Sequence, residues 1–295
     1  VYSRQKLLRK VSFLHISDIP KTQKSRKAGG SLKLSYFELL SPEPVYIQKA
    51  IGVISPKLKD IASIGINIYQ YYLSVLLMDL KTYFTMIGKP EQAELLTETE
   101  KAQISIYDLL TLNSDSIKLL QAALNFFIKE EVAYSVEHKC FLVKKNTPVP
   151  HNGEISEEAL AVGSISRETY PQVCDIICQR NFIKSSQQDD LSKAKNRKAV
   201  EIMKKLQKGR DEKAKHTKAD KNMELGNIIS AVANKSQSLN ILNIWDLTVY
   251  QVWDCFQRLS NNNIYNIQSM SVAAWGNKDN QFDAASWFKR TDNGN

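Results

Sequence analysis

Glycine, proline, cysteine and histidine are all scarce in this sequence, and each shortage excludes a class of structure. The 295 residues include 11 Gly and 8 Pro, too few for the many tight turns of a β-sandwich or β-barrel. Four cysteines in so long a chain do not indicate the disulfide framework of a small secreted domain. Cys174 and Cys178 would share one face of a helix, but no further Cys or His stands at a spacing typical of zinc ligands. We therefore expect buried free thiols, no bound metal and no cofactor.

Long apolar runs are lacking as well. The most apolar window, residues 71–78, is much shorter than a membrane-spanning helix, and polar residues flank it on both sides. The N-terminus has no apolar stretch followed by a small-residue cleavage site. We expect a soluble protein of a reducing compartment that does not enter a membrane.

Catalytic motifs are the third absence. The sequence contains no P-loop, dinucleotide-binding fingerprint, nucleophile elbow or paired zinc-ligand motif. Its acidic pairs, at residues 130–131, 157–158 and 189–190, are adjacent in sequence. On a helix their side chains would point about 100° apart, which is typical of a solvated surface rather than of a shared site. We predict that the protein is not an enzyme.

Positive charge is concentrated in two segments. Residues 1–33 hold nine Lys or Arg against one acidic residue, and residues 193–221 hold twelve against four, so each segment carries +8. Because the whole chain carries +9, the remaining residues carry −7. The excess of positive charge therefore comes from two segments and not from a uniformly basic fold.

Three interpretations of the two basic segments remain open. They could form a solvated helix and linker, bind an acidic protein, or bind nucleic acid. Residues 193–221 contain no aromatic residue that could stack on bases. This absence favours protein contact over nucleic-acid binding.

Apolar residues recur at helical spacing over much of the chain, so we predict a mainly α-helical protein. Ser55 followed by Pro56 indicates a helix start, and apolar residues at three-and-four spacing continue toward Ile87. The Gly-Lys-Pro sequence at residues 88–90 then ends this helix and opens the next. Ahead of the helix, residues 45–54 form a short apolar stretch that could be one strand.

A helix is also expected over residues 115–128, followed by a β-hairpin made of residues 132–136 and 140–143. Winged-helix DNA-binding domains contain a helix and a hairpin in this order. However, this helix ends in apolar and aromatic residues and has few Arg, Asn or Gln side chains that could read bases. We interpret the hairpin as structural.

Two capping-box patterns predict further helix starts. Residues 169–172 (Thr-Tyr-Pro-Gln) start one helix, and residues 248–251 (Thr-Val-Tyr-Gln) start another, which we expect to end before Asn261. Between them, residues 191–208 have the pattern of a basic amphipathic helix, and residues 209–220 have almost no apolar content.

These patterns divide the chain into four parts. We predict a basic arm (1–33), a helical domain with one small β-hairpin near 132–144 (34–184), a basic helix and linker (185–223) and a smaller, Trp-rich helical C-terminal domain (224–295).

Aromatic residues are the candidates for partner contact. Trp is favoured at the anchors of interfaces, and three of the four tryptophans lie within residues 245–275, with the fourth at 287. An aromatic stripe at helical spacing is nevertheless more often a core than a binding surface. The predicted partner-binding residues are Trp245, Trp253, Trp275, Trp287, Tyr69 and Tyr72.

Two stretches carry a resemblance to a known family. Residues 54–65 (ISPKLKDIASIG), leading into 69–73 (YQYYL), and residues 244–259 (IWDLTVYQVWDCFQRL) resemble patterns in the tail-assembly chaperones of tailed bacteriophages of Gram-positive hosts. The resemblance covers about a tenth of the chain and does not include the basic N-terminal arm.

The resemblance implies a non-enzymatic protein of the host cytoplasm that binds the helical tape-measure protein and tail-tube subunits. It would mask the apolar stripes of the tape measure until tube protein replaces it. The alternatives are a structural virion component, such as a tail or neck protein, and a nucleic-acid-binding protein that uses residues 1–33 and 193–221. A homo-oligomer is compatible with each of them.

The nucleic-acid hypothesis makes a direct prediction. Binding of DNA should weaken steeply as salt rises, because neutralised phosphates release their counterions. Deleting residues 1–33 and neutralising the lysines of residues 193–221 should abolish that binding in a titration. If neither duplex nor single-stranded DNA binds at low salt, the hypothesis is wrong.

Overall fold

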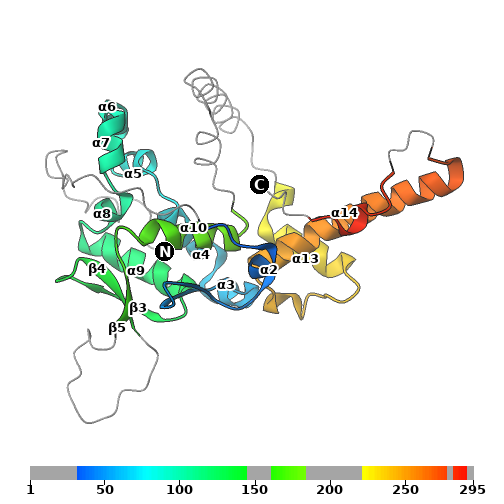
Figure 1. The fold of residues 1–295 in the computed structure, drawn as a ribbon, viewed down its shortest axis with the longest axis horizontal. Helices are drawn as coiled ribbons and strands as arrows, with labels where there is room; N and C mark the ends of the chain where they lie inside the picture. The colour runs from blue at the N-terminus through cyan, green and yellow to red at the C-terminus, as the bar shows by residue number, and fades with distance from the viewer. Residues whose placement is uncertain (1–31, 145–160, 184–220, 278–281, 291–295) are drawn as a thin grey trace, which may run out of the picture. The chain divides into compact units, whose positions relative to one another are not determined.

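The computed structural model describes residues 32–144, 161–183, 221–277 and 282–290 (Figure 1). These residues are mainly α-helical and include two small antiparallel sheets, of two and three strands, which confirms the predicted fold class at this level. The predicted basic helix at 191–208 and nearly all of the predicted arm lie outside the described residues. The four-part division stays a prediction.

The chain forms two compact units, and each unit combines segments that are far apart in sequence. Unit 1 consists of Val1–Leu34, Glu43–Ile54 and Ile61–Ile177, and unit 2 consists of Ser35–Pro42, Ser55–Asp60 and Cys178–Asn295. Two helices run from one unit into the other: α3 (Leu58–Ile64) and α10 (Tyr170–Arg180).

The remaining elements belong to one unit each. Unit 1 contains β1 (Val45–Ile47), β2 (Ile51–Val53), α4 (Ile66–Leu76), α5 (Leu80–Met86), α6 (Pro90–Leu95), α7 (Glu98–Gln103), α8 (Ile106–Leu110), α9 (Ser114–Phe127), β3 (Glu131–Ser135), β4 (Cys140–Lys144) and β5 (Ala161–Ile165). Unit 2 contains α2 (Tyr36–Leu40), η3 (Lys221–Met223), α13 (Leu225–Lys235), η4 (Ile244–Asp246), α14 (Val249–Trp275) and η5 (Ser286–Phe288).

The single helix expected from Pro56 to Ile87 is three helices, α3, α4 and α5. The first begins at Leu58, where the Asp60 carboxylate accepts the Lys57 amide at 3.0 Å. It ends before Gly65, whose φ of 87° leaves the helical region and is adopted readily only by glycine. The third starts at an N-cap, Asp79, which accepts the Thr82 amide at 2.7 Å. The continuous apolar pattern therefore hides two breaks.

The strand expected over residues 45–54 is a hairpin of β1 and β2. Residues 48 and 49 have φ of 51° and 60°, and the Ala50 amide donates to the Ile47 carbonyl at 3.1 Å. Positive φ at both central positions defines the type I′ turn that matches the twist of paired strands. Here Gln48 and Lys49 occupy these positions, so the usual Asn-Gly signal is absent from the sequence.

The hairpin near 132–144 is confirmed, and the structure adds a third strand. In β3 and β4, Glu131 pairs with Lys144 and Ser135 with Cys140, while β5 pairs on the other side of β4. Residues 161–165 were not predicted as a strand. A Cβ at Gly163 of β5 would lie 2.7 Å from the Ala50 side chain, closer than real Cβ atoms approach one another. This contact explains why glycine stands there.

Helix α9, predicted over residues 115–128, supplies much of the core of unit 1. Phe127 is fully buried and the Tyr69 ring of α4 packs against it, with centroids 6.2 Å apart. The Phe127 carbonyl accepts the Ile54 amide at 2.9 Å, which ties α9 to the end of β2. Fully buried side chains on either side of this contact include Ile51, Leu120, Leu124, Phe141, Ile165 and Ile176.

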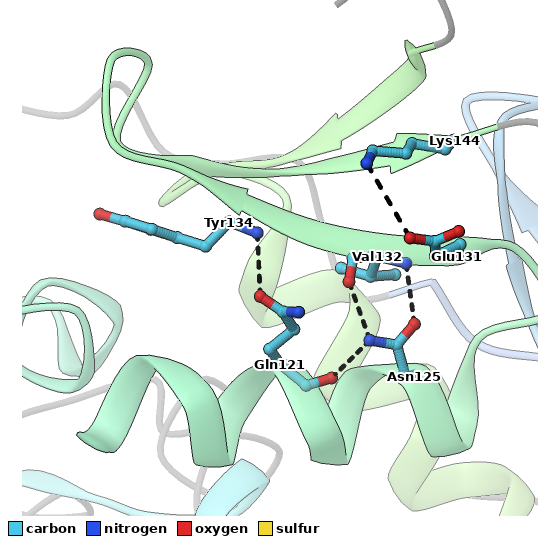
Figure 2. Close-up of polar contacts among 6 residues, drawn as sticks. All are labelled: Gln121, Asn125, Glu131, Val132, Tyr134 and Lys144. Carbon is cyan, nitrogen blue, oxygen red and sulfur yellow. Dashed lines mark hydrogen bonds and ion pairs between the residues drawn. The ribbon is translucent and has the colours of Figure 1, made fainter. Parts of the chain in front are cut away.

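The outer edge of the three-stranded sheet is capped by side chains of α9. Asn125 accepts the Val132 amide and donates to the Val132 carbonyl, both at 2.8 Å, and Gln121 accepts the Tyr134 amide at 3.0 Å (Figure 2). These amide groups take the places that a neighbouring strand would fill. An edge strand with unpaired backbone groups is a template for aggregation, so the two side chains protect β3.

The C-terminal capping box is confirmed and the helix that it starts is longer than predicted. Thr248 and Gln251 exchange both hydrogen bonds of the box. Helix α14 then continues through residues 261–263 to Trp275 and ends before Gly276. The prediction that it ends before Asn261 is wrong, because three asparagines lower helix propensity only modestly when neighbouring residues favour the helix.

Removing the amide caps of β3 should destabilise the protein. The double variant Gln121→Ala with Asn125→Ala loses the three bonds to the β3 backbone, and each is worth about 1 kcal/mol. We expect the free energy of unfolding, measured by urea denaturation, to fall by about 1–3 kcal/mol. Lys118→Ala, an exposed position on the same helix, is the control. Equal stability of the two variants would contradict the capping role.

Candidate interaction surface

Helix α14 begins at a buried junction within unit 2. The Thr248 amide donates to Gln251 Oε1 at 2.9 Å, and Thr248 is only 1% exposed. Gln251 Nε2 donates in turn to the Leu40 carbonyl of α2 at 2.8 Å, and the Leu58 amide donates to the Leu247 carbonyl at 2.9 Å. The start of α14 is therefore bonded to two segments that precede it by about 200 residues.

A polar cluster holds the C-terminal tail, residues 282–290, against α14. The Tyr36 hydroxyl donates to Asp254 Oδ1 at 2.5 Å and accepts a hydrogen bond from Arg258 Nη2 at 3.0 Å. Arg258 Nη1 also donates to the Lys289 carbonyl at 2.7 Å. Because Arg258 reaches Tyr36 and the tail at once, it joins α2, α14 and the tail.

The proximal half of α14 is a packed surface. The Trp253 ring lies parallel to Phe182, with centroids 5.6 Å apart and 8° between the planes, and meets Phe256 edge to face. Phe182 has φ of 59°, which is rare for a bulky residue and indicates that its surroundings hold it in place. Trp253 is thus half-buried by contacts within unit 2.

The distal half of α14 presents exposed apolar side chains. We name four of them the distal face: Ile264, Ile267, Met270 and Trp275, which are 52%, 65%, 65% and 78% exposed. At 100° per residue they span about 140° of the helix surface, which is the width of an amphipathic stripe. They lie on the same side of α14 as Trp253, in line with the packed proximal surface. In Figure 1 this part of α14 continues beyond α13.

The tail contacts α14 on the side opposite the distal face. The Phe282 ring contacts Tyr265, with centroids 5.5 Å apart. Tyr265, Ser269 and Val272 on that side are half-buried. The tail therefore meets α14 at Tyr265 and Arg258, on the side away from the distal face.

The six residues predicted from the sequence fall into two groups. Tyr69 is 4% exposed, and both Tyr69 and Tyr72 pack their rings on Phe126 of α9 within unit 1. Of the tryptophans, Trp253 is packed, whereas Trp245, Trp275 and Trp287 are 36%, 78% and 51% exposed. Partner binding by any of the six stays a prediction. The structure adds three residues that the sequence analysis missed, Ile264, Ile267 and Met270, because the helix was expected to stop before them.

Other kinds of site were also sought in the described ranges. No group of three or more His, Cys, Asp or Glu side chains there is placed to hold a metal ion. None of the helices in that part of the chain is both long and apolar enough to cross a membrane. The four cysteines are free thiols, and burial raises the pKa of the Cys140 and Cys255 thiols. A raised pKa leaves less of the reactive thiolate at neutral pH.

A known family model matches part of the chain. The family model described as the YomV second domain matches residues 214–292. This segment is less than half of the chain, and it includes α13, α14, the distal face and the tail. YomV is a phage-associated name, so the match is consistent with a phage protein. Neither the curated proteins nor the solved structures gave a match.

The two tryptophans of α14 should respond differently to truncation. Trp253→Ala removes the stacking contact with Phe182, and we expect it to lower the free energy of unfolding by about 2–4 kcal/mol. Trp275→Ala should change it by less than about 0.5 kcal/mol, because the side chain is mostly exposed. Urea denaturation measures both. Equal losses for the two variants would show that Trp275 is a packing residue and not part of an open surface.

Proposed function

We propose that this chain is a non-enzymatic phage protein that acts in tail assembly, as a chaperone for the helical tape-measure protein and the tail-tube subunits. The observation that carries the proposal is the distal face, an open apolar surface inside the segment that matches a phage-associated family. The resemblance of residues 54–73 and 244–259 to tail-assembly chaperones supports the more specific role.

The distal face suits a helical partner. An amphipathic helix binds a complementary surface through its apolar face, and the distal face offers four apolar side chains along one side of α14 over three turns. Fully burying a Leu- or Met-sized side chain contributes about 1.5–3 kcal/mol, so four such side chains could hold a partner reversibly. A chaperone must bind reversibly, because tube protein must later replace the chaperone on the tape measure.

The absence of charge on the distal half of α14 predicts how binding should respond to salt concentration. Residues 259–275 contain no Asp, Glu, Lys or Arg. Binding through this part of α14 should therefore depend little on ionic strength, in contrast to binding through the basic segments 1–33 and 193–221. This difference separates the chaperone from a nucleic-acid-binding protein.

Co-expression tests the proposal. The full chain should co-purify with the tape-measure protein of the same phage, and the double variant Met270→Ala with Trp275→Ala should weaken that complex by roughly a hundredfold. The control is Asn262→Ala, an exposed position on the side of α14 away from the distal face. A complex that both variants leave intact would rule out the distal face as the binding surface.

Mass spectrometry of purified, intact particles separates the chaperone from a virion component. We expect the protein to be absent from particles and present in the host cytoplasm during assembly. Its presence in particles at stoichiometric amounts would contradict the chaperone role and favour a structural tail or neck protein.

A further inference from the structure

The distal half of α14 carries no charged side chain. The protein carries +9, yet the 17 residues from 259 to 275 hold no charged side chain. A contact between different proteins commonly uses charges of opposite sign to choose its partner. In a two-fold contact between identical chains, residues near the axis meet their own copies, so a charge there would face a like charge. An uncharged face has no such repulsion and can therefore pair with a second copy of the same chain.

The order of apolar side chains fits an antiparallel pair. If Ile267 of one copy lies opposite Ile267 of the other, a residue three positions after it meets the residue three positions before it. Met270 then faces Ile264, so the centre of the contact is apolar on both sides. All three side chains are more than half exposed in the single chain, so the contact would remove them from water.

The polar residues and the two ends of the contact fit the same pairing. Ser271 would face Asn263, which gives each polar side chain a partner. Trp275 would face Leu259, so apolar side chains meet at both ends of the contact as well as at its centre. A parallel pair would instead place Trp275 against Trp275, which crowds one end of the contact.

We propose that the distal face pairs with the distal face of a second copy of this chain, antiparallel and with Ile267 at the two-fold axis. With on the order of 100 Å² lost by each of the eight distal-face side chains, the pair buries on the order of 800 Å² before flanking residues are counted, close to the lower limit of about 1,000 Å² for specific interfaces. The pairing goes beyond the proposed function and holds whether or not the same face later binds a tail protein. If the same face does bind a tail protein, that helical partner must first displace the second copy.

Sedimentation equilibrium of the full chain alone tests the pairing. We expect a species of twice the 33.5 kDa chain mass. Ile267→Glu places two like charges at the axis and should weaken the dimer by roughly a hundredfold or more. The matched control is Asn262→Glu, the same new charge at an exposed position about 140° around the helix from Ile267, and it should remain dimeric. Circular dichroism should show equal helicity for both variants.

Three results would overturn the proposal. The wild-type chain could stay monomeric at every concentration, which would leave the distal face to another occupant. The dimer could persist in Ile267→Glu, which would place the contact elsewhere. Both variants could dissociate equally, which would show a general effect of charge. None of these results bears on co-purification with a tape-measure protein, so the failure of one proposal is distinguishable from the failure of the other.

Cysteine cross-linking tests the direction of the pair. In a mixture of Ile264→Cys and Met270→Cys chains, oxidation should link the two variants to each other, because these positions face one another in the antiparallel arrangement. Each variant oxidised alone should give little dimer. The wild-type chain, with its four native cysteines, is the control for background. Efficient linking of Ile264→Cys with itself would contradict the antiparallel arrangement.

Discussion

The capping box at the start of α14 is the interaction on which the packing of unit 2 depends. Thr248 and Gln251 satisfy each other's backbone amides, as many isolated helix starts do. Gln251 also bonds to the Leu40 carbonyl, so a local capping residue holds α2, and Leu247 just before the cap accepts the Leu58 amide. Segments separated by about 200 residues in sequence meet at one helix end. The direction of α14, and with it the position of every side chain on the helix, follows from this junction.

The contrast between the two halves of α14 follows from what reaches each of them. Phe182 covers the proximal half at Trp253, whereas Tyr36 and Arg258 hold the tail on another side. The tail contacts Tyr265 and Arg258 on that side, and the distal face stays exposed. Keeping four large apolar side chains in water costs free energy that burial would recover, and a monomer rarely exposes such a contiguous patch without a use for it. The large aromatic side chains of the proximal half are thus packed within unit 2, whereas the four apolar side chains of the distal face are exposed.

Local signals in the sequence predicted local features, while features set by distant contacts escaped it. The capping box at Thr248, helix α9 and the β3–β4 hairpin were predicted because their signals lie within a few residues. The β1–β2 hairpin was missed because Gln48 and Lys49 take the positive φ usually given to Asn and Gly. Tyr69 was predicted to bind a partner but is buried, since its surroundings come from α9, more than 50 residues away. The distal face was missed because the three asparagines at residues 261–263 indicate a helix end, whereas apolar residues beyond them continue the helix.

The central claim is that the distal face is covered by another protein molecule while the chain performs its function. Hydroxyl-radical footprinting of the protein as isolated from its producing cells tests this on native side chains. In the single chain, Met270 is more exposed than Met223, at 65% against 48%, and Trp275 more than Trp287, at 78% against 51%. If the distal face is covered, Met270 is oxidised more slowly than Met223, and Trp275 is oxidised more slowly than Trp287. If Met270 and Trp275 are oxidised faster, as their exposure in the single chain implies, the face is open and the claim is wrong.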